Sequence, residues 1–262
     1  MNDNQVTETN IPNEADIKRR AINSAHEARL LCRHNLITDT VGRAGSYLQA
    51  NLVVLPSAYA THFRDLCARN PVPCPILGWT NPGDPTTVFP RGCIRTSDFD
   101  VRTDFPRYRV YEGGKLSTSK TDILEEWTND HVAFLIGCSL SFEEALKDAG
   151  FRVCHEEEGK RPAMYRTNIP VLPAGVFYDG TCVVSMRAYE EGDVERVRDI
   201  TRPYLTTHGE PVAWGWDGAE AIGIRNVHQP DYGDRQTFRE GEVPVFWVSF
   251  RLVIFLILVC VS

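Results

Sequence analysis

The stretch His131–Gly150, HVAFLIGCSLSFEEALKDAG, decides the fold that this sequence predicts. Val132–Ile136 is a short, continuous apolar run, which is typical of a strand buried on both faces in a parallel or mixed sheet covered by helices. Gly137 ends the run, and Ser141 with Glu144 forms a Ser-x-x-Glu capping box for a helix that ends before the closing glycine. The stretch therefore predicts a strand, a glycine turn and a helix, as in an α/β fold.

The turn of this stretch is a candidate site because Cys138, Ser139 and Ser141 lie at the predicted start of a helix. Free N–H groups and the helix macrodipole favour negative charge there, so a carboxylate or phosphate can bind. The same position can lower the pKa of a cysteine and increase its thiolate fraction. Cysteine is also among the residues most often buried, so a packing role for Cys138 stays open.

The composition is that of a globular protein with a large core. The chain has 262 residues, of which 42% are hydrophobic and 24% charged, which fits one large domain or two closely packed subdomains. The net charge is −7 with no basic block, which argues against nucleic-acid binding. The eight cysteines form no Cys-x-x-Cys pair and the histidines show no metal-ligand spacing, so we expect no metal site and reduced thiols in an intracellular protein.

The two ends of the chain differ from its middle. Residues 1–13 are polar and acidic, so we expect a disordered segment that is neither a secretory signal nor an Arg-rich transit peptide. The expected localisation is therefore the cytoplasm, with the mitochondrion as the alternative. Residues 249–262 form an atypical apolar tail, and its run Leu252–Val261 is too short for a membrane span of about 20 residues, so we do not expect a membrane partner. The domain is expected at residues 14–248.

Helices and strands are predicted to follow one another along this domain, in mixed sheets flanked by helices. The expected helices are Glu14–His34, Ala58–Arg69, Asp122–Trp127 and Asp193–Thr201, and the expected strands are Tyr47–Leu55, Ile76–Trp79, Phe151–His155 and Val183–Arg187, with a hairpin that pairs Tyr108–Tyr111 with Lys115–Ser117.

Polar side chains inside apolar or charged stretches are further candidates. Asn51 interrupts an apolar strand, either as a core amide satisfied by backbone groups or as a residue that faces a ligand. Residues 102–109, which include Arg107, are either a solvated strand edge with weak salt bridges or a carboxylate clamp, because a guanidinium can hold a carboxylate with two hydrogen bonds. His208, Glu210 and Asp217 lie among glycines, in loops that suit close ligand approach or form only a turn-rich surface.

Eight short motifs follow one another in the chain. They are Gln49–Pro56 (QANLVVLP), Asn70–Pro75 (NPVPCP), Thr103–Arg109 (TDFPRYR), Phe134–Glu143 (FLIGCSLSFE), Met164–Asn168 (MYRTN), Val183–Arg187 (VVSMR), His208–Pro211 (HGEP) and Glu242–Trp247 (EVPVFW). Together they resemble the D-glutamate cyclase family, whose members are also described as hydro-lyases, over residues 29–247. So many motifs in one order are hard to obtain by chance.

The resemblance implies an α/β fold of two interlocked subdomains and a lyase that converts D-glutamate to 5-oxo-D-proline plus water. It implies a small acidic substrate, the reaction requires no cofactor, and the oligomeric state stays open, a homo-oligomer included. One feature departs from the family. The segment after Trp247 normally reads Ala-Cys-Gly-Val-Thr-Pro-Gln, and here a different, apolar segment replaces it. A catalytically silent binding protein for small acidic metabolites is therefore an alternative, and a Cys-His hydrolase of amides is a third.

Ring closure requires a free amine, a proton donor for the departing oxygen, and two carboxylates held in a folded geometry. On chemical grounds His208 or Glu210 would act as base or acid, and Cys138 as a nucleophile or as a hydrogen-bonding pocket residue. We expect His208, Cys138, Arg166, Arg187 and Asn51 to converge on one cleft. The expected substrate-binding residues are Asn51, Arg107, Ser139, Ser141, Arg166, Arg187 and Asp217.

Overall fold

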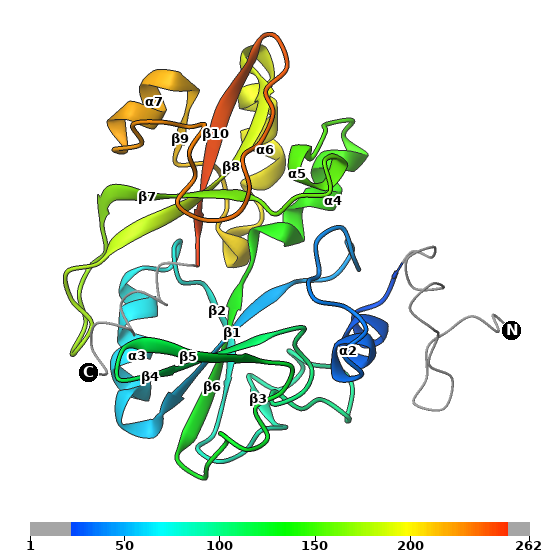
Figure 1. The fold of residues 1–262 in the computed structure, drawn as a ribbon, viewed down its shortest axis with the longest axis vertical. Coiled ribbons are helices and arrows are strands. Elements are labelled where there is room, and N and C mark those ends of the chain that lie inside the picture. Colours follow the sequence, from blue (N-terminus) through cyan, green and yellow to red (C-terminus); the bar gives the residue numbers. More distant parts are fainter. Residues whose placement is uncertain (1–21, 251–262) are drawn as a thin grey trace, which may run out of the picture.

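Two four-stranded sheets organise the computed structural model, which describes residues 22–250 (Figure 1). The strand order in the first sheet is β1 (Ala50–Pro56), β6 (His131–Gly137), β2 (Ile76–Thr80) and β3 (Val88–Phe89). The order in the second sheet is β7 (Ala163–Pro170), β8 (Thr181–Glu190), β10 (Glu242–Ser249) and β9 (Ala213–Trp214). Neighbouring strands pair antiparallel. With the helices around them, the sheets confirm the predicted α/β class.

Strand β6 lies at the centre of the first sheet because its apolar run can be buried on both faces. Phe134 and Ile136 pack into a core with α3 (Ser57–Arg69), and Leu135 packs into a second cluster on the opposite face. β1 and β2 flank β6 on its two edges. Burial of this strand is thus as its sequence predicts, since side chains alternate between the faces of a sheet.

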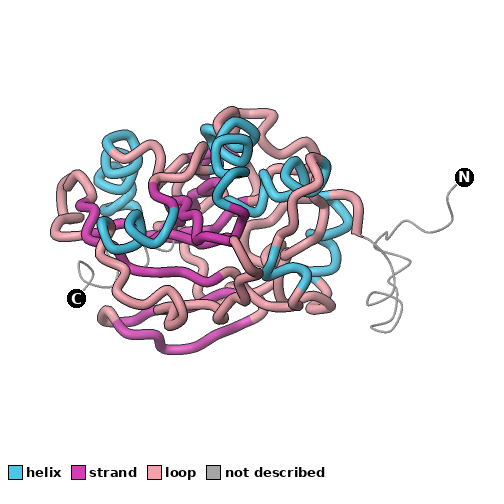
Figure 2. The backbone as a smooth tube through the Cα atoms, turned by 90° about the horizontal axis from the view of Figure 1, so that it is seen from above, coloured by secondary structure: helices cyan, strands magenta, loops and turns pink. Residues whose placement is uncertain are grey.

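The other elements cover the sheets. In Figure 2, most helices lie along the upper side of the molecule, and a pair of strands forms a separate layer at the lower edge. In Figure 1, the β4–β5 hairpin crosses in front of the first sheet. The hairpin is β4 (Tyr108–Glu112) and β5 (Lys115–Lys120), the further helices are α2 (Ala25–Arg33), α4 (Glu143–Asp148), α5 (Cys154–Glu157), α6 (Val194–Thr201) and α7 (Gly215–Ala221), and 3₁₀ turns lie at Ser139–Phe142, Glu191–Asp193 and Leu205–Thr207.

The two sheets are tied together by segments that pack into each other's cores. Phe142, which follows the central strand of the first sheet, packs with Trp247 of the second at 5.4 Å between ring centroids. In the other direction, Val248 and Phe250 at the end of β10 are buried in the core of the first sheet. The predicted atypical tail 249–262 therefore begins with the last residue of β10, Ser249, and continues with the buried Phe250, and its remainder, 251–262, lies outside the described residues.

Two predictions for the segment after β6 are wrong. Ser141 does not cap a helix, because its hydroxyl accepts a hydrogen bond from the backbone N–H of Gln49 at 2.8 Å, and α4 follows a 3₁₀ turn instead. Phe151–His155 is not a strand. The N–H of Phe151 donates a hydrogen bond to the carbonyl of Leu146 at the end of α4, and the Phe151 ring packs against Tyr189. This segment therefore pairs with no strand among the described residues.

Two further helix predictions need correction. Asp122–Trp127 forms turns rather than a helix. Of the predicted helix Glu14–His34, only the part from residue 22 onward is described, and it becomes helical at Ala25, because Ser24 is the N-cap and accepts a hydrogen bond from the N–H of Glu27 at 3.1 Å.

Candidate functional site

A cleft of about 1790 Å³ lies between the first sheet and the hairpin that covers it. Strand β1, the loops at 38–49 and 90–99, and strand β4 form its walls. Cys138, Ser139 and Leu140 lie at the end that reaches the second sheet, where Met164 and Ser185 also line the cleft. Small-molecule sites usually measure about 300–1,000 Å³, so a small ligand would occupy only part of this volume.

Cys138 and Asn51 form the polar part of the cleft next to strand β6. Cys138 follows the strand directly, and Asn51 lies on β1 opposite Ile136. Burial raises the pKa of the Cys138 thiol, and hydrogen bonds from the N–H of Leu140 and from Asn51 only partly offset this effect. The direction is opposite to the lowered pKa that the helix-start argument predicts, because desolvation outweighs the short helical turn. The thiol is therefore protonated at neutral pH.

Arg187 on β8 lies fully buried directly behind this part of the cleft. Its Nε donates a hydrogen bond to Glu143 Oε1 at 2.9 Å, and its Nη2 also contacts this oxygen. The two terminal nitrogens each reach one serine, Ser185 Oγ at 3.2 Å and Ser139 Oγ at 3.1 Å. The rings of Phe142 and Trp247 lie 4.8 and 5.3 Å from the guanidinium carbon and hold its plane in place.

The charge of Arg187 is balanced by Glu143, which is itself 3% exposed. Burial opposes ionisation of Glu143, but the guanidinium of Arg187 and the nearby His155 outweigh it and lower the pKa of this carboxyl group. His155 Nε2 lies 3.1 Å from Glu143 Oε1. Burial disfavours the charged ring, yet the contacts with Cys154 and Glu143 raise the pKa of His155. The three side chains form a compact buried charge network.

Four arginines that line the cleft have no carboxylate partner among residues 22–250. These are Arg43, Arg95, Arg107 and Arg109. The Nε atom of Arg43 is buried and has no hydrogen-bond partner in the described part of the chain. The lining is therefore rich in free cationic groups although the whole chain carries a net charge of −7.

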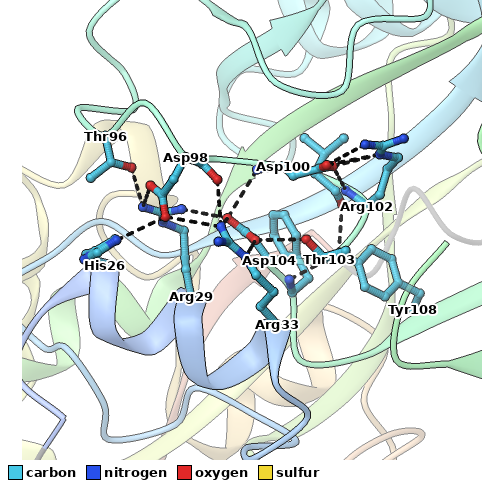
Figure 3. A network of polar contacts seen from close by, with 12 residues as sticks. His26, Arg29, Arg33, Thr96, Asp98, Asp100, Arg102, Thr103, Asp104 and Tyr108 are labelled. Atoms are coloured by element: carbon cyan, nitrogen blue, oxygen red, sulfur yellow. Dashed lines mark hydrogen bonds and ion pairs between the residues drawn. The ribbon is translucent and has the colours of Figure 1, made fainter. Parts of the chain in front are cut away.

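The wall of the cleft is held by ion pairs between α2 and the loop that precedes β4 (Figure 3). Arg29 and Arg33 each contact Asp104, at 2.6 and 2.9 Å, and the side chain of Asp104 has no exposed surface. Asp98 joins the network. Burial opposes its ionisation, but hydrogen bonds from Thr96 and the other neighbours hold its pKa well below the usual range. This charged segment therefore divides into an anchor around Asp104 and free arginines further along.

His208 lies close to this end of β6 but is not part of the cleft lining. Its ring is 2% exposed, and Nδ1 lies 2.8 Å from the carbonyl oxygen of Val72. Burial lowers the pKa of His208 to about 4, against hydrogen bonds with the backbone of Val72 and Gly137 that raise it. The ring is therefore neutral at pH 7, and its contact joins two loops. Its catalytic role remains a prediction.

The structure places the remaining predicted residues outside the cleft lining as well. Glu210 is partly exposed and pairs with Arg198 at 2.9 Å. Arg166 is exposed and its Nε donates to the hydroxyl of Tyr232. Asp217 is exposed on α7. Of the five residues predicted to converge on one cleft, Asn51 and Cys138 line it and Arg187 lies behind it, whereas His208 and Arg166 are not brought in. Among the other predicted site residues, Ser139 and Arg107 line the cleft, and Ser141, Glu210 and Asp217 do not.

Three polar residues of the cleft lining, Ser185, Arg43 and Arg95, were not predicted from the sequence. Ser185 precedes Arg187 by two positions on β8, so both side chains leave the strand on the same face, and this spacing could have indicated Ser185. Arg43 and Arg95 lie in glycine-containing loops, and no feature of their local sequences indicates a site.

The described residues contain no cluster of three or more histidine, cysteine or acidic side chains that could hold a metal ion. Within residues 22–250, none of the helices has the length and apolar character needed to cross a membrane.

Fold and cleft together define an α/β protein with a large cleft that contains several arginines, and a comparison with known proteins identifies its family. The family model described as D-glutamate cyclase matches residues 132–250. A protein of Schizosaccharomyces pombe named "Putative hydro-lyase" is 51% identical over 229 residues, which are 87% of this chain and 75% of that protein. A protein of Bacillus licheniformis with the same description is 48% identical over 222 residues, which are 84% of this chain and 82% of that protein.

A third protein so named, from Geobacillus kaustophilus, is 45% identical over 227 residues, which cover 86% of this chain and 82% of the relative. Identity of this size over most of both chains leaves no doubt about descent. The chain belongs to the D-glutamate cyclase family, as its motifs predict.

Proposed function

We propose that this chain is a hydro-lyase that closes D-glutamate to 5-oxo-D-proline with release of water. The family to which it belongs supports this activity class. The observation that carries the choice of substrate is the set of cleft arginines without a carboxylate partner in the described residues. A dicarboxylate would supply the missing anions, because a guanidinium binds a carboxylate in a planar, two-bonded geometry.

The reaction makes defined demands on the site. The ammonium group of D-glutamate loses two protons in all, its nitrogen bonds to the γ-carboxyl carbon, and one γ-oxygen takes up both protons and leaves as water. The chain must therefore fold the substrate back on itself, remove a proton from nitrogen and protonate the departing oxygen. Orientation alone can contribute about 7–11 kcal/mol to such an intramolecular step.

Cys138 is the titratable residue that lines the cleft beside Asn51 and Ser139. Because burial raises its pKa, the thiol stays protonated and is suited to donating a hydrogen bond to the departing oxygen. A thiolate nucleophile would need a lowered pKa, which this environment opposes. Within this proposal, Arg107 and its neighbours bind the α-carboxylate and Cys138 acts at the γ-carboxyl group.

The test is to incubate the purified protein with D-glutamate and to detect 5-oxoproline by its mass, which is lower by one water. L-glutamate under the same conditions tests the chirality, and a protein-free sample measures spontaneous ring closure. The charge-removing variant R107Q/R109Q is expected to raise KM while kcat changes little. Absence of product from D-glutamate above the protein-free rate would refute the proposal.

One observation favours a second candidate, a binding protein without turnover. The family's polar segment after Trp247 is replaced by Val248, Ser249 and Phe250, and Phe250 is buried in the core of the first sheet. If the polar segment supplies a reacting group elsewhere in the family, this chain lacks it. Calorimetric binding of D-glutamate without product formation would support this candidate over the lyase.

A further inference from the structure

Two serine hydroxyls at the polar end of the cleft share one buried guanidinium. Ser139 follows β6, and Ser185 lies on β8 of the other sheet. Both line the cleft although they are only 6% and 2% exposed. Each Oγ accepts a hydrogen bond from a different terminal nitrogen of Arg187, at 3.1 and 3.2 Å. The two hydroxyls are therefore held next to each other by one planar group.

The hydrogen bonds of these serines are incomplete on the donor side. A hydroxyl has one proton to donate, and its oxygen here already accepts from Arg187. Neither O–H has an acceptor among the described residues. Arg187 thus donates a hydrogen bond to each serine oxygen, and the two O–H groups remain free to donate to a ligand in the cleft, next to the Cys138 thiol. Because Glu143 balances the charge of Arg187, the two O–H donors rather than a net positive charge favour a negatively charged oxygen here.

The arrangement is also rigid. Glu143 fixes Arg187 through Nε and Nη2, and the rings of Phe142 and Trp247 flank the guanidinium. Donors that are held before the substrate arrives need no reorganisation during the reaction, which makes them more effective than mobile groups. This rigidity distinguishes the serine pair from the exposed cleft arginines Arg95, Arg107 and Arg109.

We propose that Ser139 and Ser185, oriented by Arg187, form a carboxylate subsite that binds the γ-carboxyl group of an acidic amino acid and stabilises the oxyanion formed from it. This inference rests on the proposed function for the identity of the ligand. As the amine nitrogen bonds to the γ-carbon, the carbon–oxygen π pair moves onto one γ-oxygen, which receives the two O–H hydrogen bonds. The pair returns when the other oxygen leaves as water with the two protons from nitrogen.

The test uses S139A, S185A and the double variant, with T167V as the matched control. Thr167 on β7 also carries a buried hydroxyl, but this hydroxyl donates to the carbonyl of Cys182 and does not line the cleft. Each serine variant is expected to lower kcat about 10²- to 10³-fold with a smaller change in KM, as for loss of an oxyanion donor. T167V is expected to keep the parent kcat, and melting temperatures show that all variants are folded.

Binding provides a readout that does not depend on turnover. D-glutamate is titrated against D-norvaline, which has a methyl group in place of the γ-carboxylate. Each serine variant is expected to bind D-glutamate about tenfold more weakly and D-norvaline as the parent does, because only the carboxylate accepts the lost hydrogen bond. Equal losses for both ligands, or changes below threefold in both kcat and D-glutamate affinity, would overturn the subsite.

The outcomes separate this inference from the proposed function. Serine-dependent binding of D-glutamate without 5-oxoproline would leave the subsite and refute the lyase activity. Turnover that does not depend on the serines would leave the lyase activity and refute the subsite. A parent protein that binds no D-glutamate would refute both.

Discussion

The two sides of the carboxyl end of β6 use polar side chains in opposite ways. On one side, Cys138 and Ser139 line the cleft with hydrogen-bonding capacity that is left for a ligand. On the other side, His208 is buried against the backbone carbonyl of Val72. Both sides contain polar residues from family motifs, yet the first is arranged for binding and the second for holding loops together.

Gly137 shows why the two sides stay separate. A Cβ atom at this position would lie 1.9 Å from the carbonyl oxygen of Thr206, so the backbone of the loop that carries His208 packs directly on the strand. Because successive side chains of an extended chain point to opposite faces, Cys138 then faces the cleft. Proximity in space to a candidate nucleophile is therefore no proof that a histidine shares its site.

The largest expected effect on stability comes from removing Arg187, the buried cation behind the side of β6 that faces the cleft. R187M leaves Glu143 buried without its partner, which we expect to lower the free energy of unfolding by about 3–5 kcal/mol in a denaturant titration. The double variant R187M/E143L removes both charges and should recover most of this loss. A single variant as stable as the parent would show that Glu143 does not depend on Arg187.

The histidine side is tested by H208N, because asparagine tolerates the left-handed φ of +87° at this position. The pKa of His208 is lowered from 6.5 to about 4, so between these values the unfolded chain binds a proton that the folded chain does not. The free energy of unfolding should therefore fall by about 3 kcal/mol as the pH drops from 6.5 to 4, at 1.36 kcal/mol per pKa unit. H208N should lack this dependence.

The same variant decides the catalytic prediction for His208. If the residue only holds loops together, kcat of the folded H208N protein at pH 7.5 should stay within a few-fold of the parent. A loss of about 10²–10⁴ in kcat with an unchanged melting temperature would instead place His208 in acid–base chemistry.

The boundary between the two sides is tested by G137A. The added methyl group must displace the backbone at Thr206, so we expect a loss of about 1–3 kcal/mol in the free energy of unfolding. G150A, at a glycine with a positive φ and no atoms within 4 Å of the added Cβ, controls for backbone strain without a clash. A smaller loss for G137A than for G150A would contradict the close packing.

Cys138 should react more slowly with iodoacetamide than a free thiol. Since burial raises its pKa, we expect a rate at pH 7.5 below that of free cysteine and a rate that still rises above pH 9. The C138S variant identifies the labelled site by mass spectrometry. Rapid labelling that levels off below pH 8 would show a reactive thiolate.

The smallest effect is expected at Glu210. It pairs with Arg198 at a partly exposed position, so E210Q should lower the free energy of unfolding by less than about 1 kcal/mol, and high salt should shrink the difference further. The kcat of E210Q measures its predicted acid–base role separately. A loss of 10² or more would mean that Glu210 reaches the substrate after a rearrangement.

Much of the fold could be predicted because the relevant signals are local. The apolar run Val132–Ile136 specifies a strand that must be buried on both faces, and β6 is such a strand. The hairpin β4–β5 follows from the Gly-Gly turn between its strands. Phe151–His155 failed as a strand because its short apolar pattern does not specify whether a neighbouring strand edge is available.

For the site, the sequence by itself determined which residue types are present and in which motifs, and these include Cys138, Ser139, Asn51 and Arg107. Only the tertiary structure decided which of them face a common space. Ser141 turned to the backbone of Gln49, and Ser185 came from a distant strand to share Arg187 with Ser139. The physical reason is that side-chain direction at a strand end depends on which segments pack against that end. Those segments, here the loop at Thr206 and strand β8, lie far away in the chain.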